Sequence, residues 1–249
     1  PVIVLDRPNP LGGLKIDGPL PREEYQSFEA YHLVPIRHGM TIGELLLMVN
    51  EMGWVKDLKR VDLKIVPMAN WKREQYFDET KLPWKKPAPY IKDLNTLIMY
   101  AGMDLLRGTN INVGFGTEDP YLRFGSPWLA TKFFKEKLDM LNLPGVKFQE
   151  VVFRPRGSPY YNRVPKYNGM SCSGIEISIT DAKSAKPLET ATSIIALISQ
   201  LHPREFSWEA QGYIDKLFGS NLLRLFIAQK KPAGYLSPQY MHDEIEFSK

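Results

Sequence analysis

The sequence of 249 residues is long enough to bury a large core, as one large domain or as two smaller ones. Its 32 basic and 28 acidic residues are spread along the chain without a block of like charge, so we do not expect a nucleic-acid-binding protein, which usually shows a clustered basic stripe. A single cysteine excludes an intrachain disulfide bond, and no apolar run reaches the length of a transmembrane segment.

The first residues of the chain predict a β-strand. Residues 2–5 form a continuous apolar run, which is typical of a strand buried on both faces inside a parallel sheet. The next comparable strand is residues 63–66, and two strands alone do not make a stable sheet that is covered on both faces. We therefore expect further polypeptide upstream of the chain.

Between these strands the sequence predicts a short extended piece at residues 32–36 and then a helix. Thr41 and Glu44 match a capping box, in which each side chain satisfies a backbone N–H of the first helical turn. Apolar residues follow at helical spacing, and Gly53 is expected to end the helix.

A proline-rich segment, residues 82–89, is the expected boundary between two domains. Residues 1–80 alternate strands with helices, which is the pattern of an α/β fold. Residues 81–249 mix helices and strands. The expected helices there are 94–108 after an Asp93 cap, 126–142 from a Ser-Pro start, 191–198, 210–217 and 221–229, and the expected strands are 111–115, 148–153 and 175–179.

Eight segments carry a resemblance to a known family. They are residues 4–13, 35–45, 68–73, 106–111, 114–117, 124–128, 153–155 and 172–174. The first reads Val-Leu-Asp-Arg-Pro-Asn-Pro-Leu-Gly-Gly and the second Pro-Ile-Arg-His-Gly-Met-Thr-Ile-Gly-Glu-Leu, and both are highly specific. In this order, across nearly the whole chain, they resemble the NamZ-type exo-β-N-acetylmuramidases.

The resemblance implies a bacterial glycosidase of cell-wall turnover, which releases N-acetylmuramic acid from the non-reducing end of peptidoglycan fragments. It implies an α/β architecture in which a Rossmann-like domain is followed by a smaller α+β domain, with the active site between them. Residues 1–80 would be the C-terminal part of the first domain. The resemblance also implies a secreted or periplasmic protein, with a lipid anchor through an upstream N-terminus as an alternative, and no cofactor.

Catalysis by a glycosidase normally needs two carboxyl groups across the scissile bond. The resemblance places the leading candidate in a Pro-Glu-His-Gly motif upstream of this chain, so an upstream fragment of the same protein is an expected partner. Within the chain the candidates are Asp6, Glu44 and His38. Each also has a structural interpretation. Asp6 can cap its proline-rich turn, Glu44 can belong to the capping box, and His38 can form a hydrogen bond with a backbone carbonyl.

Substrate-binding candidates lie in the same segments. Arg37, Lys72 and Arg73 are candidates for the lactyl carboxylate of muramic acid, and Arg is the better match through its bidentate fork. Surface solvation is the alternative for each. Arg7 and Asn9 belong to the first resembling segment and are candidates from that position.

Two further pairs are candidates for contacts with the sugar. Asn70 and Trp71 follow the end of a strand, where the Trp ring offers an apolar face to a pyranose; anchoring of the domain junction is the alternative for Trp71. Gly116 and Thr117 lie in a glycine-rich loop that permits a close approach to a sugar. Many family members have Arg where this chain has Phe115, which puts the substrate preference in doubt.

Three other interpretations follow from the residues. The glycine-rich loop lacks the Lys and the helix start of a nucleotide loop, so no nucleotide is expected. Cys172 has no basic flank that would lower its pKa, and His and Cys do not cluster at zinc spacings, so no metal is expected. A non-catalytic peptidoglycan-binding protein of the same ancestry remains the alternative function.

Overall fold

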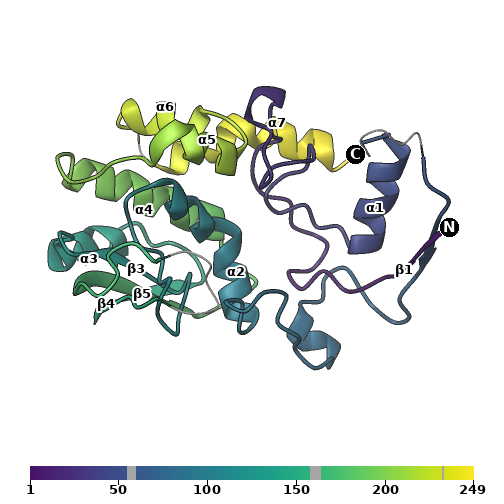
Figure 1. Cartoon of the computed structure of the whole chain (residues 1–249), viewed down its shortest axis with the longest axis horizontal. Coiled ribbons are helices and arrows are strands. Elements are labelled where there is room, and N and C mark those ends of the chain that lie inside the picture. The colour runs from purple at the N-terminus through teal and green to yellow at the C-terminus, as the bar shows by residue number, and fades with distance from the viewer. Residues whose placement is uncertain (55–59, 158–163, 232) are drawn as a thin grey trace.

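The computed structural model describes residues 1–54, 60–157, 164–231 and 233–249 and shows a mixed α/β fold (Figure 1). It contains a two-stranded parallel sheet and a three-stranded antiparallel sheet. In Figure 1, β1 and α1 lie at one end of the molecule, and the antiparallel sheet lies at the other end, with α4 above it and α2 beside it toward the centre. The expected α/β class is confirmed.

The parallel sheet pairs β1 (Val2–Leu5) with β2 (Leu63–Val66), as the two apolar runs predicted. The prediction that β1 is buried on both faces is wrong for the described residues, because Ile3 is 62% exposed and Leu5 66%. Each strand has a single strand neighbour, and α1 packs against β2, so much of the apolar surface of β1 faces solvent.

Helix α1 (Ile42–Glu51) starts with the predicted capping box. The Thr41 hydroxyl accepts a hydrogen bond from the Glu44 N–H at 3.2 Å, and the Glu44 Oε2 accepts one from the Thr41 N–H at 2.9 Å. Gly53 follows the helix with φ +66°, a conformation that suits glycine, so the predicted end is confirmed. Residues 32–36 form no strand; bends occupy this segment, and an isolated bridge joins Arg37 to Asp17.

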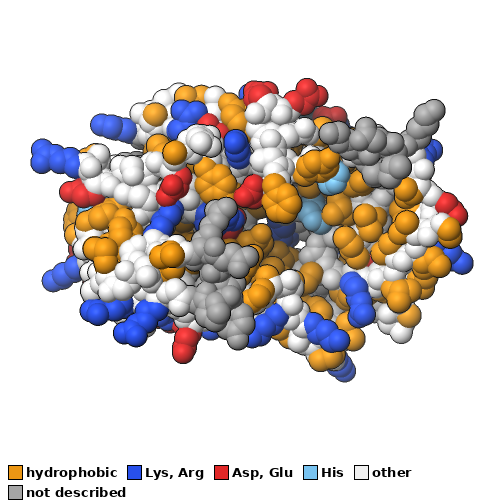
Figure 2. Space-filling model, viewed as in Figure 1, with side chains coloured by type: hydrophobic (Ala, Val, Ile, Leu, Met, Phe, Trp, Pro, Cys, Tyr) orange, Lys and Arg blue, Asp and Glu red, His pale blue; other side chains and the backbone are white. Residues whose placement is uncertain are grey.

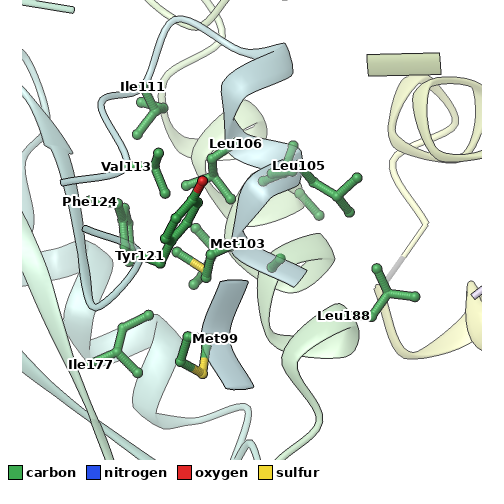
Figure 3. Close-up of a cluster of buried hydrophobic side chains, with 14 of the residues drawn as sticks. Met99, Met103, Leu105, Leu106, Ile111, Val113, Tyr121, Phe124, Ile177 and Leu188 are labelled. Carbon is green, nitrogen blue, oxygen red and sulfur yellow. The ribbon is translucent and has the colours of Figure 1, made fainter. Parts of the chain in front are cut away.

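The antiparallel sheet has the order β3-β5-β4 and supports most of the core. Its strands are β3 (Arg123–Ser126), β4 (Val146–Phe153) and β5 (Cys172–Ile179). The helices that cover it are α2 (Leu94–Met103), α3 (Thr131–Asp139) and α4 (Pro187–Leu201). Figure 3 shows how Met99 and Met103 of α2 meet Phe124 of β3 and Ile177 of β5 around the ring of Tyr121.

Several predicted elements of residues 81–249 differ from the structure. The predicted helix 94–108 ends at Met103 and continues as a 3₁₀ turn, and the predicted helix 210–217 is an α-helix only from Tyr213. Residues 111–115 form no strand, and a single isolated bridge joins Asn112 to Gly125. Helix α3 starts at Thr131 and not at Ser126, because Ser126 pairs with Ser173 at the end of β3. The Ser-Pro pair has the chemistry of a helix start, and strand pairing overrides it at this position.

The C-terminal segment returns to the N-terminal part of the chain. Helix α7 (Ser237–Phe247) lies between the two ends of the molecule in Figure 1. Its Glu244 Oε1 accepts a hydrogen bond from the Gly18 N–H at 3.0 Å, and its Asp243 Oδ2 accepts one from the Leu20 N–H at 3.2 Å. These side chains therefore bind α7 to the loop that follows β1.

The remaining elements are short helices. They are α5 (Tyr213–Phe218), α6 (Leu222–Ala228) and the 3₁₀ turns η1 (Glu23–Tyr25), η2 (Phe77–Thr80), η3 (Asp104–Gly108), η4 (Ala210–Gly212) and η5 (Ala233–Tyr235). Across the described parts of the chain, every helix is too short or too polar to cross a bilayer.

Candidate functional site

Asp6 lies directly after β1 and contacts the start of α1. Its Oδ1 accepts a hydrogen bond from the Gly43 N–H at 2.8 Å, and its Oδ2 accepts one from the Thr41 hydroxyl at 2.8 Å. A carboxylate at a helix N-terminus is stabilised by the helix dipole and the unpaired N–H groups there. Gly43 is required at this point, because a Cβ would lie 2.8 Å from the Asp6 carboxyl carbon. Asp6 is thus committed to holding α1; its catalytic role stays a prediction.

Glu44 is also engaged through both carboxylate oxygens. Oε2 closes the capping box, and Oε1 pairs with the guanidinium of Arg73. The Arg73 guanidinium carbon lies 5.9 Å from the centre of the Trp71 ring, close enough for a cation–π contact. The structure therefore brings Glu44, Arg73 and Trp71 together, and it satisfies Glu44 and Arg73 mainly through each other.

His38 retains one ring nitrogen for a ligand. Its Nδ1 accepts a hydrogen bond from the Met40 N–H at 3.1 Å, so the neutral ring carries its proton on Nε2. Burial lowers the pKa of His38, and the nearby charge of Glu44 acts in the opposite direction. At neutral pH the ring is therefore neutral, with a donor at Nε2 that bonds to no other described residue.

Arg37 and Asn9 hold the loop that follows β1. Arg37 is 7% exposed, and its Nη2 donates to the Leu11 carbonyl at 2.6 Å and to the Tyr76 hydroxyl at 2.8 Å. The Asn9 amide donates to the Met40 carbonyl at 2.9 Å and accepts from the Leu11 N–H at 3.0 Å. Both side chains thus have structural partners within the protein, and their contact with substrate stays a prediction.

The other predicted residues of this region lie at the surface. Arg7, Asn70 and Lys72 are exposed, and Asn70 has a left-handed backbone with φ 63°. Trp71 is partly buried, and its indole N–H is a buried donor with no partner among the described residues. Among these four residues, Trp71 is therefore the one whose buried donor would be satisfied by a hydrogen-bond acceptor of a substrate.

The glycine-rich loop lies beside the antiparallel sheet, since it directly precedes β3 and the neighbouring Asn112 bridges to Gly125. Thr117 donates from its hydroxyl to the Gly114 carbonyl at 2.7 Å, and the Gly116 carbonyl accepts from the Arg156 N–H at 2.9 Å. Gly116 has φ +83°, and a Cβ there would lie 2.7 Å from the Arg156 carbonyl oxygen. The glycine is thus explained by the close approach of protein backbone.

A cavity of about 680 Å³ opens next to this loop. Aromatic and polar side chains lie together in its lining. The aromatic residues are Tyr90, Phe115, Tyr121 and Tyr213, and the polar residues are Arg107, Asn112, Lys166, Glu209, Gln211 and Lys216. Aromatic walls with a few converging polar groups are typical of a small-molecule site. Figure 2 shows the centre of one face hollowed, with hydrophobic, basic and histidine side chains around the hollow.

Arg107, at the end of η3, is the most elaborately supported side chain of the cavity. Its Nη1 donates to both carboxylate oxygens of Asp104, at 3.2 and 3.0 Å, and its Nη2 donates to the Tyr213 hydroxyl. The Tyr121 hydroxyl donates to Asp104 Oδ1 at 2.9 Å. Burial raises the pKa of Asp104, and Arg107 opposes this shift. These contacts fix the orientation of the guanidinium.

Lys166 has different surroundings. Its Nζ donates to the backbone carbonyls of Arg107, at 3.1 Å, and of Thr109, and it pairs with Glu209 Oε1 at 2.8 Å. Burial lowers the pKa of Lys166, and its hydrogen bond with Glu209 raises it. Three acceptors use the three donors of an ammonium group, so Lys166 supports the chain around Arg107.

The sequence alone did not identify this cavity. Arg107 lies in the resembling segment 106–111, which was a signal, but no role followed from it. Lys166, Glu209 and Tyr213 come from separate parts of the chain that no motif connects. Only the fold brings them together.

The fold and the cavity define a mixed α/β protein with an aromatic pocket that holds an oriented arginine. Comparison with known proteins then gives the family. The model described as exo-β-N-acetylmuramidase NamZ, N-terminal, matches residues 1–95, and the corresponding C-terminal model matches residues 98–249. The chain belongs to the NamZ family of exo-β-N-acetylmuramidases.

Individual relatives agree with this assignment. The peptidoglycan β-N-acetylmuramidase NamZ of Bacillus subtilis (strain 168) is 35% identical over 249 residues, which are 100% of this chain and 58% of that protein. Two crystal structures of DUF1343 family proteins from Bacteroides fragilis NCTC 9343 are similar, with TM-scores of 0.82 and 0.79 at 27% and 26% identity. The matches cover 96% and 99% of this chain, and 65% and 63% of those chains. The chain thus spans less than two thirds of the length of these relatives.

Proposed function

We propose that the protein is a glycosidase that releases N-acetylmuramic acid from the non-reducing end of peptidoglycan fragments. Membership of the NamZ family and similarity to a peptidoglycan β-N-acetylmuramidase support a muramidase-type activity. The observation in this chain that carries the substrate class is the cavity, because it combines aromatic walls with a guanidinium.

The chemistry of the cavity suits a sugar acid. Muramic acid carries a carboxylate, which an arginine binds in a planar, charge-assisted contact. Its ring faces and its acetamido and lactyl methyl groups are apolar, and Tyr90, Phe115 and Tyr213 offer apolar surface to them. A volume of about 680 Å³ lies within the usual range for small-molecule sites.

Within the chain we propose that His38 contacts the sugar. Its Nε2–H is a donor, and burial lowers its pKa, which favours the neutral ring. Asp6 and Glu44 remain candidates for acid or base, but each would have to leave hydrogen bonds that hold the start of α1. Because peptidoglycan lies outside the cytoplasmic membrane, we also propose a secreted or periplasmic location.

The test uses the protein at its natural full length with two chromogenic β-glycosides, one of N-acetylmuramic acid and one of N-acetylglucosamine. The two sugars differ only by the lactyl ether, so the second substrate is the matched control. We expect release of chromophore from the first substrate and little from the second. Equal rates on both, or release from the glucosaminide alone, would contradict the proposed specificity.

A second candidate is a peptidoglycan-binding protein without turnover. The observation that favours it is that both motif carboxylates of this chain, Asp6 and Glu44, are held in structural contacts. Calorimetry that shows muropeptide binding, together with no chromophore release over hours, would support this candidate over the enzyme.

A further inference from the structure

The cavity contains an arginine that one internal carboxylate orients and another approaches without a hydrogen bond. Asp104 takes Nη1 of Arg107 in two hydrogen bonds, at 3.2 and 3.0 Å. On the Nη2 side lies Glu29, whose Oε1 is 3.8 Å from Arg107 Nη2. A charge-assisted N–H···O contact is normally about 2.7–2.9 Å long, so this second pairing is far from its best geometry.

Glu29 comes from a different part of the chain. It lies in the turn between η1 and the segment before α1, and its side chain is 33% exposed. The Tyr213 hydroxyl donates to the same Oε1 at 3.1 Å, and Arg107 in turn donates to the Tyr213 hydroxyl. A surface carboxylate therefore lies at the donor edge of Arg107 and Tyr213.

From these contacts we propose that Arg107 and Tyr213 form the receptor for the carboxylate of an acidic sugar, and that Glu29 occupies the receptor in competition with this carboxylate. The inference rests on the proposed function, and it names the group that the cavity recognises. Exchange of one carboxylate for another keeps the charge next to Arg107 unchanged. The incoming group gains a hydrogen bond at proper length, while Glu29 loses only a long ion pair and one hydrogen bond.

Lys166 and Lys216 are the other cations that line the cavity. Lys216 lacks the planar fork that binds a carboxylate in two bonds, and the contacts of Lys166 exclude it as the receptor. Its ammonium group already donates to two backbone carbonyls and to Glu209. Those carbonyls belong to Arg107 and Thr109, so Lys166 holds the backbone that carries the receptor. A substrate that bound the Lys166 ammonium group in place of these carbonyls would leave them without a hydrogen-bond donor.

Asp104 has the opposite role from Glu29. Its carboxylate is buried, accepts from Tyr121 and holds Nη1 in two bonds, so it orients the guanidinium. It cannot leave without exposing a charged arginine to a site of low polarity. Of the two carboxylates, only Glu29 lies on a partly exposed turn that can move aside.

The experiment measures binding by calorimetry with N-acetylmuramic acid and, as the neutral probe, N-acetylglucosamine. The variants are Arg107→Lys, Glu29→Gln and, as a control, Glu24→Gln. Glu24 is an exposed carboxylate of the same segment and forms no ion pair with any described residue, so its loss changes net charge without touching Arg107. Thermal unfolding of each variant reports whether the fold is retained.

For Arg107→Lys we expect about tenfold weaker binding of the acid, because an ammonium lacks the planar fork. Binding of N-acetylglucosamine should be unchanged. For Glu29→Gln we expect about threefold tighter binding of the acid and no change for the neutral sugar, since one competing charge is removed. Glu24→Gln should match the parent protein.

If Arg107→Lys binds the acid with the affinity of the parent protein, Arg107 is not the receptor for the carboxylate. If Glu29→Gln binds the acid more weakly than the parent, Glu29 does not compete with the carboxylate. If Arg107→Lys fails to fold, the affinity of Glu29→Gln for the acid still tests the proposal. Glu29 is a partly exposed surface group, so we expect this variant to fold. Failure of the proposed function looks different. Then no glycoside is hydrolysed, while the dependence of acid binding on Arg107 and Glu29 persists and supports the receptor.

Discussion

Asp17 offers a test of the electrostatics that connect the N-terminal loop to α7. Its backbone pairs with that of Arg37 through two hydrogen bonds of 2.9 Å, and the next residue, Gly18, binds Glu244 of α7. Burial, and next the negative charge of Glu244, raise the pKa of Asp17 from 3.8 to about 6, and Arg37 lowers it. Glu189 raises it and Lys186 lowers it by smaller amounts. The perturbation we consider is Asp17→Asn.

A raised carboxyl pKa means that the folded protein binds the proton more tightly than the unfolded chain does. The contribution of Asp17 to stability is therefore most favourable below pH 3.8, and it declines as the pH rises through about 6. At about 1.4 kcal/mol for each pH unit, the displacement of this pKa corresponds to at most about 3 kcal/mol at neutral pH. The amide of Asn carries no charge at any of these pH values, so Asp17→Asn removes the free-energy cost of burying a charged carboxylate.

We expect the variant Asp17→Asn to be more stable than the parent by about 1–3 kcal/mol at pH 7.5 and nearly equal to it at pH 4. Urea unfolding at both pH values, followed by circular dichroism, gives the two free energies of unfolding. Asp62→Asn is the matched control, because the Asp62 side chain is exposed; it should change little at either pH. A variant that is less stable at pH 7.5 would refute the reasoning and show that the charged form of Asp17 is favourable.

Three further substitutions test packing and capping. Gly108→Ala should cost about 1–3 kcal/mol in urea unfolding, because its Cβ would lie 2.8 Å from the Ile214 Cα; an unchanged midpoint would show that the backbone yields there. Arg37→Ala should lower the free energy of unfolding by about 2–3 kcal/mol, because the hydrogen bond to Tyr76 is lost. The KM for the muramic acid glycoside should stay within about twofold. Normal stability together with a large rise in KM would make Arg37 a substrate ligand. Thr41→Ala should cost about 1 kcal/mol by removing the helix cap, and no change in the thermal midpoint would contradict a stabilising cap.

Local signals in the sequence predicted the elements whose cause is local. The Thr41 capping box gave the start of α1, and the apolar spacing of residues 191–198 gave α4. The alternation in residues 175–179 gave β5 with one buried and one wetter face. The cap and the apolar spacing lie within the two helices themselves, and the alternation that sets the two faces of β5 lies within the strand, so these features could be predicted.

Other elements depend on distant residues and could not be predicted. Ser126 has the features of a helix cap, but its backbone pairs with Ser173, which lies 47 residues later in the chain. The apolar spacing of residues 111–115 resembles a strand, yet the chain turns there around the Asn112 side chain, which donates to the Phe115 carbonyl. Helix α7 docks through Tyr240, which is buried in the core, and through carboxylates that bind the N-terminal loop, and neither set of partners is near in sequence.

The candidate site shows the same division. The resembling segments contain residues that the structure brings together at the start of α1, namely Asp6, Thr41, Glu44 and Arg73. A sequence motif points to a residue, but it does not show whether that residue contacts the substrate or positions another side chain. Only the hydrogen-bond partners make this distinction.

The bonding around α1 also constrains where chemistry can occur. An acid or base must come within hydrogen-bond distance of the substrate, and a carboxylate whose oxygens already accept several hydrogen bonds within the protein has to leave them to do so. Asp6 accepts three, from Arg7, Thr41 and Gly43, which argues against it as the base. His38 leaves the same region with an Nε2 donor that bonds to no other described residue, so His38 and Trp71 are side chains near α1 with a donor available to a substrate.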